Sequence, residues 1–173
     1  MKCILDSDAI STLTNPESPD KEAIHQLFLS LGEKSVISLS ILTIYEFEFS
    51  IASCTDSKKR ERIQQVLTEL KKQFSIINLG FEDATIYGHL KARLREKTGM
   101  NQNALKRHNL DLALAGIAIA NDCIIISKDK IYKEHLQAID NRLQCLNWGE
   151  IRVRLHKGTK CDMELCCIIG YSW

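Results

Sequence analysis

Short apolar runs alternate with longer amphipathic stretches along the first 148 residues of the chain. Runs with the length and apolar character of buried strands lie at 2–5, 35–39, 74–79, 123–127 and 143–148. Helical spacing of apolar residues marks the stretches 21–31, 41–52, 58–73 and 81–98, and Leu112 to Ala120 is apolar on every side, as in a buried helix. This alternation predicts an α/β fold, with a parallel sheet of about five strands flanked by helices on both faces.

Two polar segments interrupt this pattern and are expected to be loops. One contains Asn15-Pro16 and Ser18-Pro19 and separates the first strand from the first amphipathic helix. The other runs from Met100 to Asn109, after a glycine that ends the helix at 81–98. The sequence therefore predicts that the chain enters the buried helix at Asp111 directly from a polar loop.

The composition fits one domain with a real core. The 173 residues are 45% hydrophobic, with a mean hydropathy of −0.15, and no apolar run is long enough to span a membrane. Four cysteines lie in apolar or helical stretches without regular spacing, as expected in a reducing compartment: Cys3, Cys54, Cys123 and Cys145. We expect a cytoplasmic protein.

The last stretch of the chain differs from the rest. Residues 149–173 begin with basic residues and end with cysteines, so we divide the chain into a domain at 1–148 and a tail at 149–173 of unknown structure. His156 together with Cys161, Cys166 and Cys167 is a weak zinc-site alternative, because the paired C-x-x-C hooks of ordinary structural sites are missing.

Four acidic residues follow strands or occupy helices at positions suited to one site. Asp6 and Asp129 end predicted strands, and Asp111 opens the buried helix. Ligand sites of parallel sheets lie outside the carboxyl ends of the strands. Glu46 lies in an apolar helix, on a stripe with Thr43 and Ser50 that would suit a wet cavity.

Each acid also has a simpler explanation. The three aspartates are suited to capping helices or turns, and Glu46 could form a surface salt bridge. If the four converge, however, mutual repulsion and burial would protonate them unless a cation neutralised their charge. Mg²⁺, or Mn²⁺ in its place, takes oxygen ligands and leaves room for phosphate oxygens, so the pattern favours phosphodiester hydrolysis.

With these residues in order, the chain resembles a PIN-domain ribonuclease of the VapC family, the toxin half of bacterial type II toxin-antitoxin pairs. The resemblance covers Met1 to about Trp148 and is carried by four segments: Leu5 to Asp8, Ser40 to Glu46, Asp111 to Ala118, and Ser127 to Asp129. It assigns the acidic metal site to Asp6, Glu46, Asp111 and Asp129. Ser7, Asp8, Thr43 and Ser127 would support those ligands.

The resemblance also implies an activity and partners. It implies RNA hydrolysis by a Mg²⁺-activated water, a small cognate antitoxin that lays a segment across the acidic pocket, and a homodimer. Ile44, Phe47 and Phe49 are apolar residues that could face a partner. The formal net charge of +1 gives no global sign of nucleic-acid binding, so the RNA contacts are assigned to a local basic run before Asp111, namely Arg93, Arg95, Lys106 and Arg107. A solvated helix face is the alternative for that run.

Two other functions are compatible with parts of the sequence. Asp6-Ser7-Asp8 after an apolar strand imitates the D-x-D of haloacid-dehalogenase-type phosphatases, in which the first aspartate is a nucleophile. Glu46 has no role in such an enzyme. A PIN-fold interaction module without activity is the second alternative, against which the presence of all four acids argues.

Overall fold

A single parallel sheet organises the computed structural model, which describes residues 1–15, 17–32 and 34–150. Its strands are β1 (Lys2–Leu5), β2 (Val36–Ser40), β3 (Ser75–Ile77), β4 (Ile124–Ile126) and β5 (Gln144–Leu146). They lie in the order β3-β2-β1-β4-β5, and every neighbouring pair is parallel. The predicted parallel α/β sheet is confirmed. Residues 151–173, most of the expected tail, lie outside the described residues.

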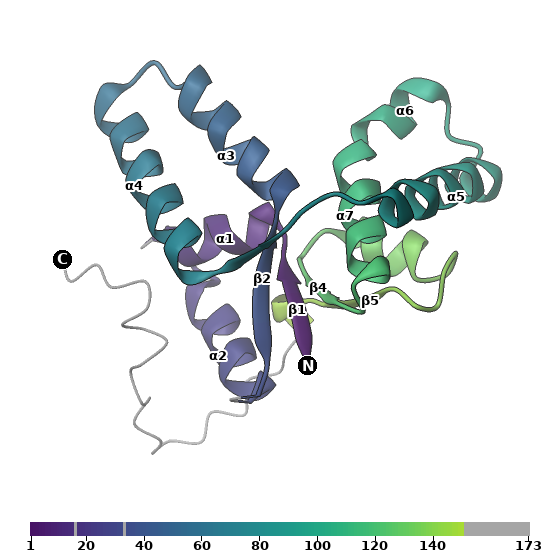
Figure 1. Cartoon of the computed structure of the whole chain (residues 1–173), viewed down its shortest axis with the longest axis horizontal. Coiled ribbons are helices and arrows are strands. Elements are labelled where there is room, and N and C mark those ends of the chain that lie inside the picture. The colour runs from purple at the N-terminus through teal and green to yellow at the C-terminus, as the bar shows by residue number, and fades with distance from the viewer. Residues whose placement is uncertain (16, 33, 151–173) are drawn as a thin grey trace.

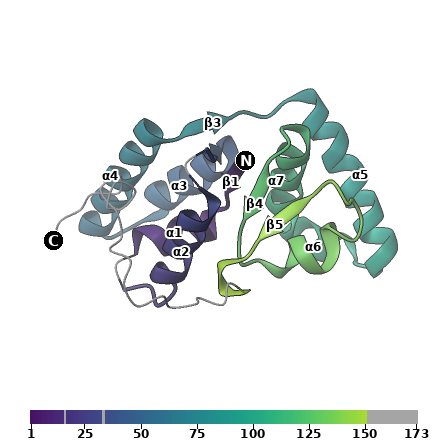
Figure 2. The same cartoon turned by 90° about the horizontal axis from the view of Figure 1, so that it is seen from below.

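Helices cover both faces of this sheet, as Figure 2 shows. On one side lie α1 (Ser7–Thr14), α2 (Lys21–Leu31), α3 (Ile41–Ser53) and α4 (Ser57–Gln73). On the other lie α5 (Phe81–Thr98), α6 (Gln102–Arg107) and α7 (Asn109–Ala120). A π-helical segment, η1 (Ile131–Leu136), follows β4, and a 3-10 turn, η2 (Trp148–Glu150), follows β5. None of the helices in the described ranges is long and apolar enough to cross a membrane.

Alternating side chains of the central strands pack into two separate hydrophobic cores, one on each face of the sheet. Ile4 and Ile125 point to the face covered by α5 and α7, whereas Leu5 and Ile126 point to the face covered by α1 to α4. All four are fully buried. Successive residues of a strand face opposite sides, so a short run that is apolar at every position must be covered on both faces. The continuous apolar runs of the sequence thus correspond to the doubly covered centre of the sheet.

Two helices were not predicted. The segment expected to be a loop before residue 21 contains α1, which begins immediately after Asp6 and ends before the Asn15-Pro16 pair. The polar loop expected at 100–109 contains α6, because the Asn101 side chain accepts hydrogen bonds from the backbone N–H groups of Asn103 and Ala104. In both places a capping side chain stabilises a short helix whose hydrophobic periodicity is too brief to recognise.

Element boundaries also differ from the prediction. The buried helix α7 begins at Asn109, so Asp111 lies inside its first turn and does not open it. The predicted strands at 74–79, 123–127 and 143–148 are each only three residues long. Their flanking residues leave the ladder as the chain turns toward the helices at the sheet edge.

The helices beyond the carboxyl ends of the strands form two arms. In Figure 1, α3 and α4 project on one side of these ends, and α5, α6 and α7 lie on the other. β1 is the strand at which the chain order reverses, since β2 pairs with one of its edges and β4 with the other. This is the position at which doubly wound sheets hold ligands.

Candidate functional site

Two of the predicted acids lie just after the central strands β1 and β4. Asp6 follows β1 and Asp129 follows β4 by three residues, and the backbone N–H of Asp6 donates to the Ile126 carbonyl oxygen at 3.2 Å. The parallel pairing of Leu5 with Ile126 thus places the segments that follow both strands at one edge of the sheet.

Two helices bring the other acids to the same place. Glu46 lies in the second turn of α3 and Asp111 in the first turn of α7. All four acids line a single cavity of about 350 Å³, which we call the acidic cavity. Its other lining residues are Ser7, Asp8, Ser40, Leu42, Thr43, Leu110, Leu114 and Lys128. The structure therefore brings together every acid that the sequence assigned to the site.

Asp6 combines a capping role with a place in the acidic cavity. Its Oδ1 accepts a hydrogen bond from the backbone N–H of Ser7 at 2.8 Å, as an N-terminal cap of α1 would. Its Oδ2 accepts from the Ser127 hydroxyl at 2.9 Å and from the Tyr132 hydroxyl at 3.3 Å. The same carboxylate therefore caps α1 and lines the acidic cavity.

Asp8 is held by the segment that follows β4. Its Oδ2 accepts from the backbone N–H of Lys128 at 2.8 Å and from the Ser127 hydroxyl at 3.1 Å. Its Oδ1 is buried and has no hydrogen-bond partner within the described part of the chain. A buried carboxylate oxygen without a donor is costly, and a cation would remove part of that cost.

Asp111 and Asp129 have local partners. Asp111 Oδ2 lies 3.0 Å from Nδ1 of His108, the residue that links α6 to α7. Asp129 Oδ1 accepts from the backbone N–H of Ile131 at 2.9 Å, as a turn aspartate does. Glu46 has no ion-pair partner among the described residues, so the salt-bridge alternative for it is not observed.

Burial and mutual repulsion raise the pKa of four carboxyl groups of the acidic cavity, those of Asp6, Asp8, Glu46 and Asp111. Burial, followed by the charge of Asp8, raises the pKa of Asp6 to about 7 in spite of hydrogen bonds from Ser127 and Ser7. Burial also raises the pKa of Asp8, Glu46 and Asp111 above their ordinary values, and the charge of Asp111 contributes to the increase at Glu46. The site stabilises protonated carboxyl groups unless positive charge enters the acidic cavity.

The donor set suits a hard divalent cation. Carboxylate and hydroxyl oxygens dominate the polar lining, and these are the ligands that Mg²⁺ and Mn²⁺ prefer. Within the described ranges, no three His, Cys, Asp or Glu side chains gather closely enough to hold an ion in this conformation. Mg²⁺ requires no such cage, because it usually binds one or two carboxylates and keeps several waters. The residues present therefore fit this kind of ion.

The predicted supporting residues surround the acids. A hydrogen bond from Ser7 lowers the pKa of Glu46 against the effect of burial. Thr43 is buried, and its Oγ1 lies 3.0 Å from Oγ of Ser40, the cap of α3, and 3.5 Å from the Leu5 carbonyl oxygen. Ser127 joins Asp6 to Asp8, as described above. These contacts fix α1, α3 and the β4 end relative to one another.

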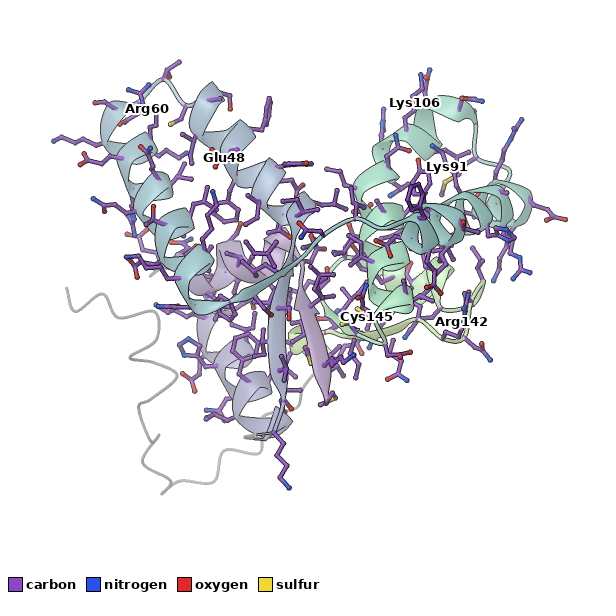
Figure 3. All side chains as sticks on the ribbon, in the orientation of Figure 1. Glu48, Arg60, Lys91, Lys106, Arg142 and Cys145 are labelled. Atoms are coloured by element: carbon purple, nitrogen blue, oxygen red, sulfur yellow. The ribbon has the colours of Figure 1, made fainter. Side chains whose placement is uncertain are left out.

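The predicted RNA-binding residues lie outside the acidic cavity. None of Arg93, Arg95, Lys106 and Arg107 belongs to its described lining. Arg93 donates to the Ile139 carbonyl oxygen at 3.2 Å, so it is directed toward the segment after η1. Lys106 and Arg107 end α6, directly before His108, and Figure 3 places Lys106 at the tip of that arm.

A second hollow adjoins the acidic cavity between α1, α3 and α4. This side groove has a volume of about 700 Å³ and shares Ser7 and Glu46 with the acidic cavity. The rest of its lining is Ser11, Thr14, Asn15, Phe47, Ser50, Lys59, Arg62, Ile63 and Val66. Glu46 and Ser50 of the predicted polar stripe therefore face open space, as expected.

The sequence alone did not reveal three contributors to the site: Tyr132, Lys128 and the pairing of His108 with Asp111. Tyr132 reads as an ordinary core residue and reaches Asp6 across 126 positions of sequence. Lys128 lies between two predicted site residues and binds Asp20 through Nζ at 2.5 Å. The spacing of three between His108 and Asp111 was the one available signal, since the residue just before a helix lies close to the third residue of its first turn.

The fold and the site define a doubly wound α/β domain with an acidic cavity at its topological switch point. The PIN domain family model matches residues 3–135, so the chain belongs to the PIN domain family. This membership replaces the dehalogenase-type alternative. No curated protein matches the chain in sequence.

Solved VapBC structures and a FitAcB structure share the fold. A chain of VapBC2 from Rickettsia felis, solved bound to a promoter DNA fragment, is 23% identical, with a TM-score of 0.67 over 86% of this chain and 99% of that one. A chain of FitAcB from Neisseria gonorrhoeae is 19% identical, with a TM-score of 0.68 over 87% of this chain and 100% of that one. VapBC-1 from nontypeable Haemophilus influenzae gives 17% identity and a TM-score of 0.66 over 87% and 100%. The resemblance inferred from the sequence is confirmed at the level of family and fold.

Proposed function

We propose that this PIN-domain protein is a Mg²⁺- or Mn²⁺-dependent endoribonuclease and the toxin of a VapC-type toxin-antitoxin pair. The observation that carries the proposal is the convergence of Asp6, Glu46, Asp111 and Asp129 on one cavity. PIN domains are generally nucleases, and the structural neighbours are toxin-antitoxin complexes. Both facts support the same conclusion. A PIN-fold interaction module would not need four carboxylates in one cavity at a cost in stability.

The carboxylates of the acidic cavity would hold the cation. When bound, the ion lowers the pKa of a water molecule and offsets negative charge on the scissile phosphate. Asp6 is the best-fixed candidate ligand, because three donors orient its two oxygens. Glu46 and Asp111 approach from opposite arms, on α3 and α7. A cation between them would allow carboxyl groups with raised pKa to ionise at neutral pH.

Basic residues outside the acidic cavity would guide the RNA backbone toward it. Lys106 and Arg107 are the best placed, because they directly precede His108, which contacts Asp111. Arg95 and Arg93 lie further along α5, and Arg93 already bonds to Ile139. Contacts of this kind bind phosphates without reading sequence. We therefore expect charge-neutral variants at Lys106 and Arg107 to raise KM more than they lower kcat.

RNA cleavage tests the proposed activity. The purified full chain, freed of any co-purified protein, is incubated with mixed structured RNAs in Mg²⁺, in Mn²⁺ and in EDTA. We expect cleavage in either metal, none in EDTA, and a loss of at least about 100-fold in Asp6→Asn and Glu46→Gln.

The matched control is Glu48→Gln, which changes an exposed glutamate two residues along α3 that pairs with Lys71 (Figure 3). It should retain wild-type activity. Cleavage in EDTA, or equal cleavage by Asp6→Asn, would refute a metal-dependent nuclease, and no cleavage by the wild type would favour the interaction module.

The side groove is our proposed binding site for the antitoxin segment. It runs directly into the acidic cavity through Ser7 and Glu46, so one extended peptide could occupy both. Its chemistry changes along its length, from the acids through apolar Phe47, Ile63 and Val66 to basic Lys59 and Arg62. The complementary segment carries a basic side chain for the acids, then apolar side chains, then an acidic group.

Charge reversal in the side groove tests the partner. The candidate antitoxin is the product of a short reading frame next to the gene, co-expressed with this chain. Lys59→Glu should weaken the complex at least about tenfold in a binding titration, because it repels the acidic group. Arg60→Glu is the control, since Arg60 is exposed on the same helix and outside the groove lining (Figure 3). Equal loss in both variants would point to general charge attraction instead.

The expected homodimer stays a prediction. Ile44 cannot contribute to it, because its side chain is buried in the core, and Phe47 lines the side groove. Phe49 is 73% exposed and Tyr45, one turn before it on α3, is 59% exposed. These two aromatic side chains are the candidates for the contact. Light scattering on the wild type and on Phe49→Ser would test it.

A further inference from the structure

Tyr132 lies within the core and directs its only polar atom at the candidate site. The residue is fully buried, and its ring packs in the cluster formed by α5, α7 and η1. Its hydroxyl donates to Oδ2 of Asp6 at 3.3 Å. Phenylalanine would fill the same volume in this apolar cluster, so packing alone does not explain the hydroxyl.

The Tyr132 hydroxyl supplies a hydrogen-bond donor that Ser127 alone cannot supply to both carboxylates it contacts. Ser127 Oγ lies 2.9 Å from Asp6 Oδ2 and 3.1 Å from Asp8 Oδ2, yet a serine hydroxyl has one proton to donate. The same oxygen accepts from the backbone N–H of Asp129 at 2.9 Å. Asp8 Oδ2 has a second donor in the backbone N–H of Lys128. For Asp6 Oδ2, the second donor in the described structure is Tyr132.

The π-helical segment η1 positions the Tyr132 hydroxyl at hydrogen-bonding distance from Asp6. The Tyr132 carbonyl oxygen accepts from the backbone N–H of Gln137 at 2.8 Å, the i to i+5 bond that defines the wide turn. Asp129, two residues before the segment, accepts a hydrogen bond from the backbone N–H of Ile131. The same short stretch thus supplies one acid of the site and the donor that holds another.

We propose that Tyr132 is a positioning residue, whose hydroxyl fixes the Asp6 carboxylate in the orientation that binds the divalent cation. This inference rests on the proposed metal-dependent function but makes a claim of its own about metal affinity. Donors behind a metal-binding carboxylate commonly change metal affinity by about tenfold or more when removed. The step concerned is binding, so the effect should disappear when metal is saturating.

Removing one oxygen atom tests the proposal. Tyr132→Phe, the wild type and a control are titrated with Mn²⁺ by calorimetry, and RNA cleavage is measured across metal concentrations. We expect the Mn²⁺ Kd of Tyr132→Phe to rise about tenfold. The metal concentration for half-maximal cleavage should rise by the same factor, while kcat at saturating metal stays within about threefold.

The control is Tyr87→Phe, which also removes a phenol hydroxyl with two hydrogen-bond partners, Lys91 and Asn109, outside the acidic cavity. Its Mn²⁺ affinity should equal that of the wild type. Circular dichroism and the unfolding midpoint show whether each variant is folded. Should Tyr132→Phe be unfolded in the assay buffer, the Mn²⁺ titrations of all three chains are repeated in a stabilising osmolyte such as sucrose, at a concentration at which circular dichroism shows each of them folded.

Ser127→Ala sharpens the result. This variant leaves Tyr132 as the remaining side-chain donor to Asp6 Oδ2 in the described structure, so Tyr132→Phe should cost more in the Ser127→Ala background than alone. A folded Tyr132→Phe with wild-type Mn²⁺ affinity would overturn the proposal, as would a wild type that binds no Mn²⁺. Weakened binding in a chain that never cleaves RNA would uphold it and refute the proposed function alone.

Discussion

Single carboxylates in this protein serve structure and site at the same time. Asp6 caps α1 with one oxygen and faces the other acids with its second. Asp129 closes a turn and also lines the acidic cavity. For Asp6 and Asp129, a local structural contact and a place in the acidic cavity are therefore compatible in one side chain. A parallel sheet places helix starts at the strand ends where its ligands bind, so one side chain can serve both.

The raised pKa of Asp6 predicts how stability depends on pH. The folded state raises this pKa from 3.8 to about 7, so between those values it binds more protons than the unfolded state does. Without metal, the free energy of unfolding should therefore fall as pH rises from about 4 to 7 and level off above. The full shift corresponds to about 4 kcal/mol, and relaxation reduces it, so we expect roughly 2 kcal/mol.

Asp6→Asn removes this dependence. The variant should be more stable than the metal-free wild type at pH 8 by roughly 2 kcal/mol and should show no such gain at pH 4. Urea unfolding at both pH values, in EDTA, measures the difference. Glu48→Gln should follow the wild type. The opposite result would be a wild type that gains stability between pH 4 and 7, with the same change in Asp6→Asn. Ionisation of Asp6 would then not destabilise the folded state.

At the scale of elements, the close packing of α5 on α7 supports one wall of the acidic cavity. Gly116 of α7 meets the backbone of α5, and a Cβ there would lie 2.8 Å from the Asp83 carbonyl oxygen. The two helices can approach this closely because the residue has no side chain. Asp111 lies near the start of the same helix, so the packing distance also determines where that carboxylate lies.

Gly116→Ala should therefore destabilise the protein. Backbone atoms would have to move apart, which costs about 1 to 3 kcal/mol. The matched control is Gly88→Ala on α5, an exposed helical position with nothing within 4 Å of the added Cβ. It should be neutral or stabilising by up to about 1 kcal/mol. Chemical unfolding measures the free energy of unfolding of both variants. Equal effects would show that α5 and α7 can move apart at no cost in stability.

Long elements were predictable and short ones were not. The helices at 21–31 and 81–98 have the predicted limits, because their apolar spacing persists over many turns and a glycine follows each. α1 and α6 have eight and six residues, too few for a periodicity, and depend on the caps Asp6 and Asn101. The four acids were found because each lies beside a recognisable element. The Tyr132 contact was not, because only the folded sheet brings it to Asp6.

At the scale of the whole molecule, the acidic cavity lies between the side groove on one arm and the other arm, where α6 ends with two basic residues. The acidic cavity lies where the strand order reverses at β1, and the two helical arms seen in Figure 1 each contribute part of its lining. On one arm the side groove leads away from the acids, and on the other Lys106 and Arg107 end α6, outside the described lining of the acidic cavity. Under the proposed function, RNA and the antitoxin segment would therefore approach the same acids from different directions.

The chemical ends left by the reaction test this account most directly. RNA cut by the Mg²⁺-loaded chain in H₂¹⁸O, under single-turnover conditions, is analysed by mass spectrometry. Attack by water predicts linear phosphate monoester ends that contain one ¹⁸O atom, with no cut RNA in the Asp6→Asn reaction. Ends with a 2′,3′-cyclic phosphate would contradict the account, because they arise from attack by the neighbouring 2′-hydroxyl of the RNA.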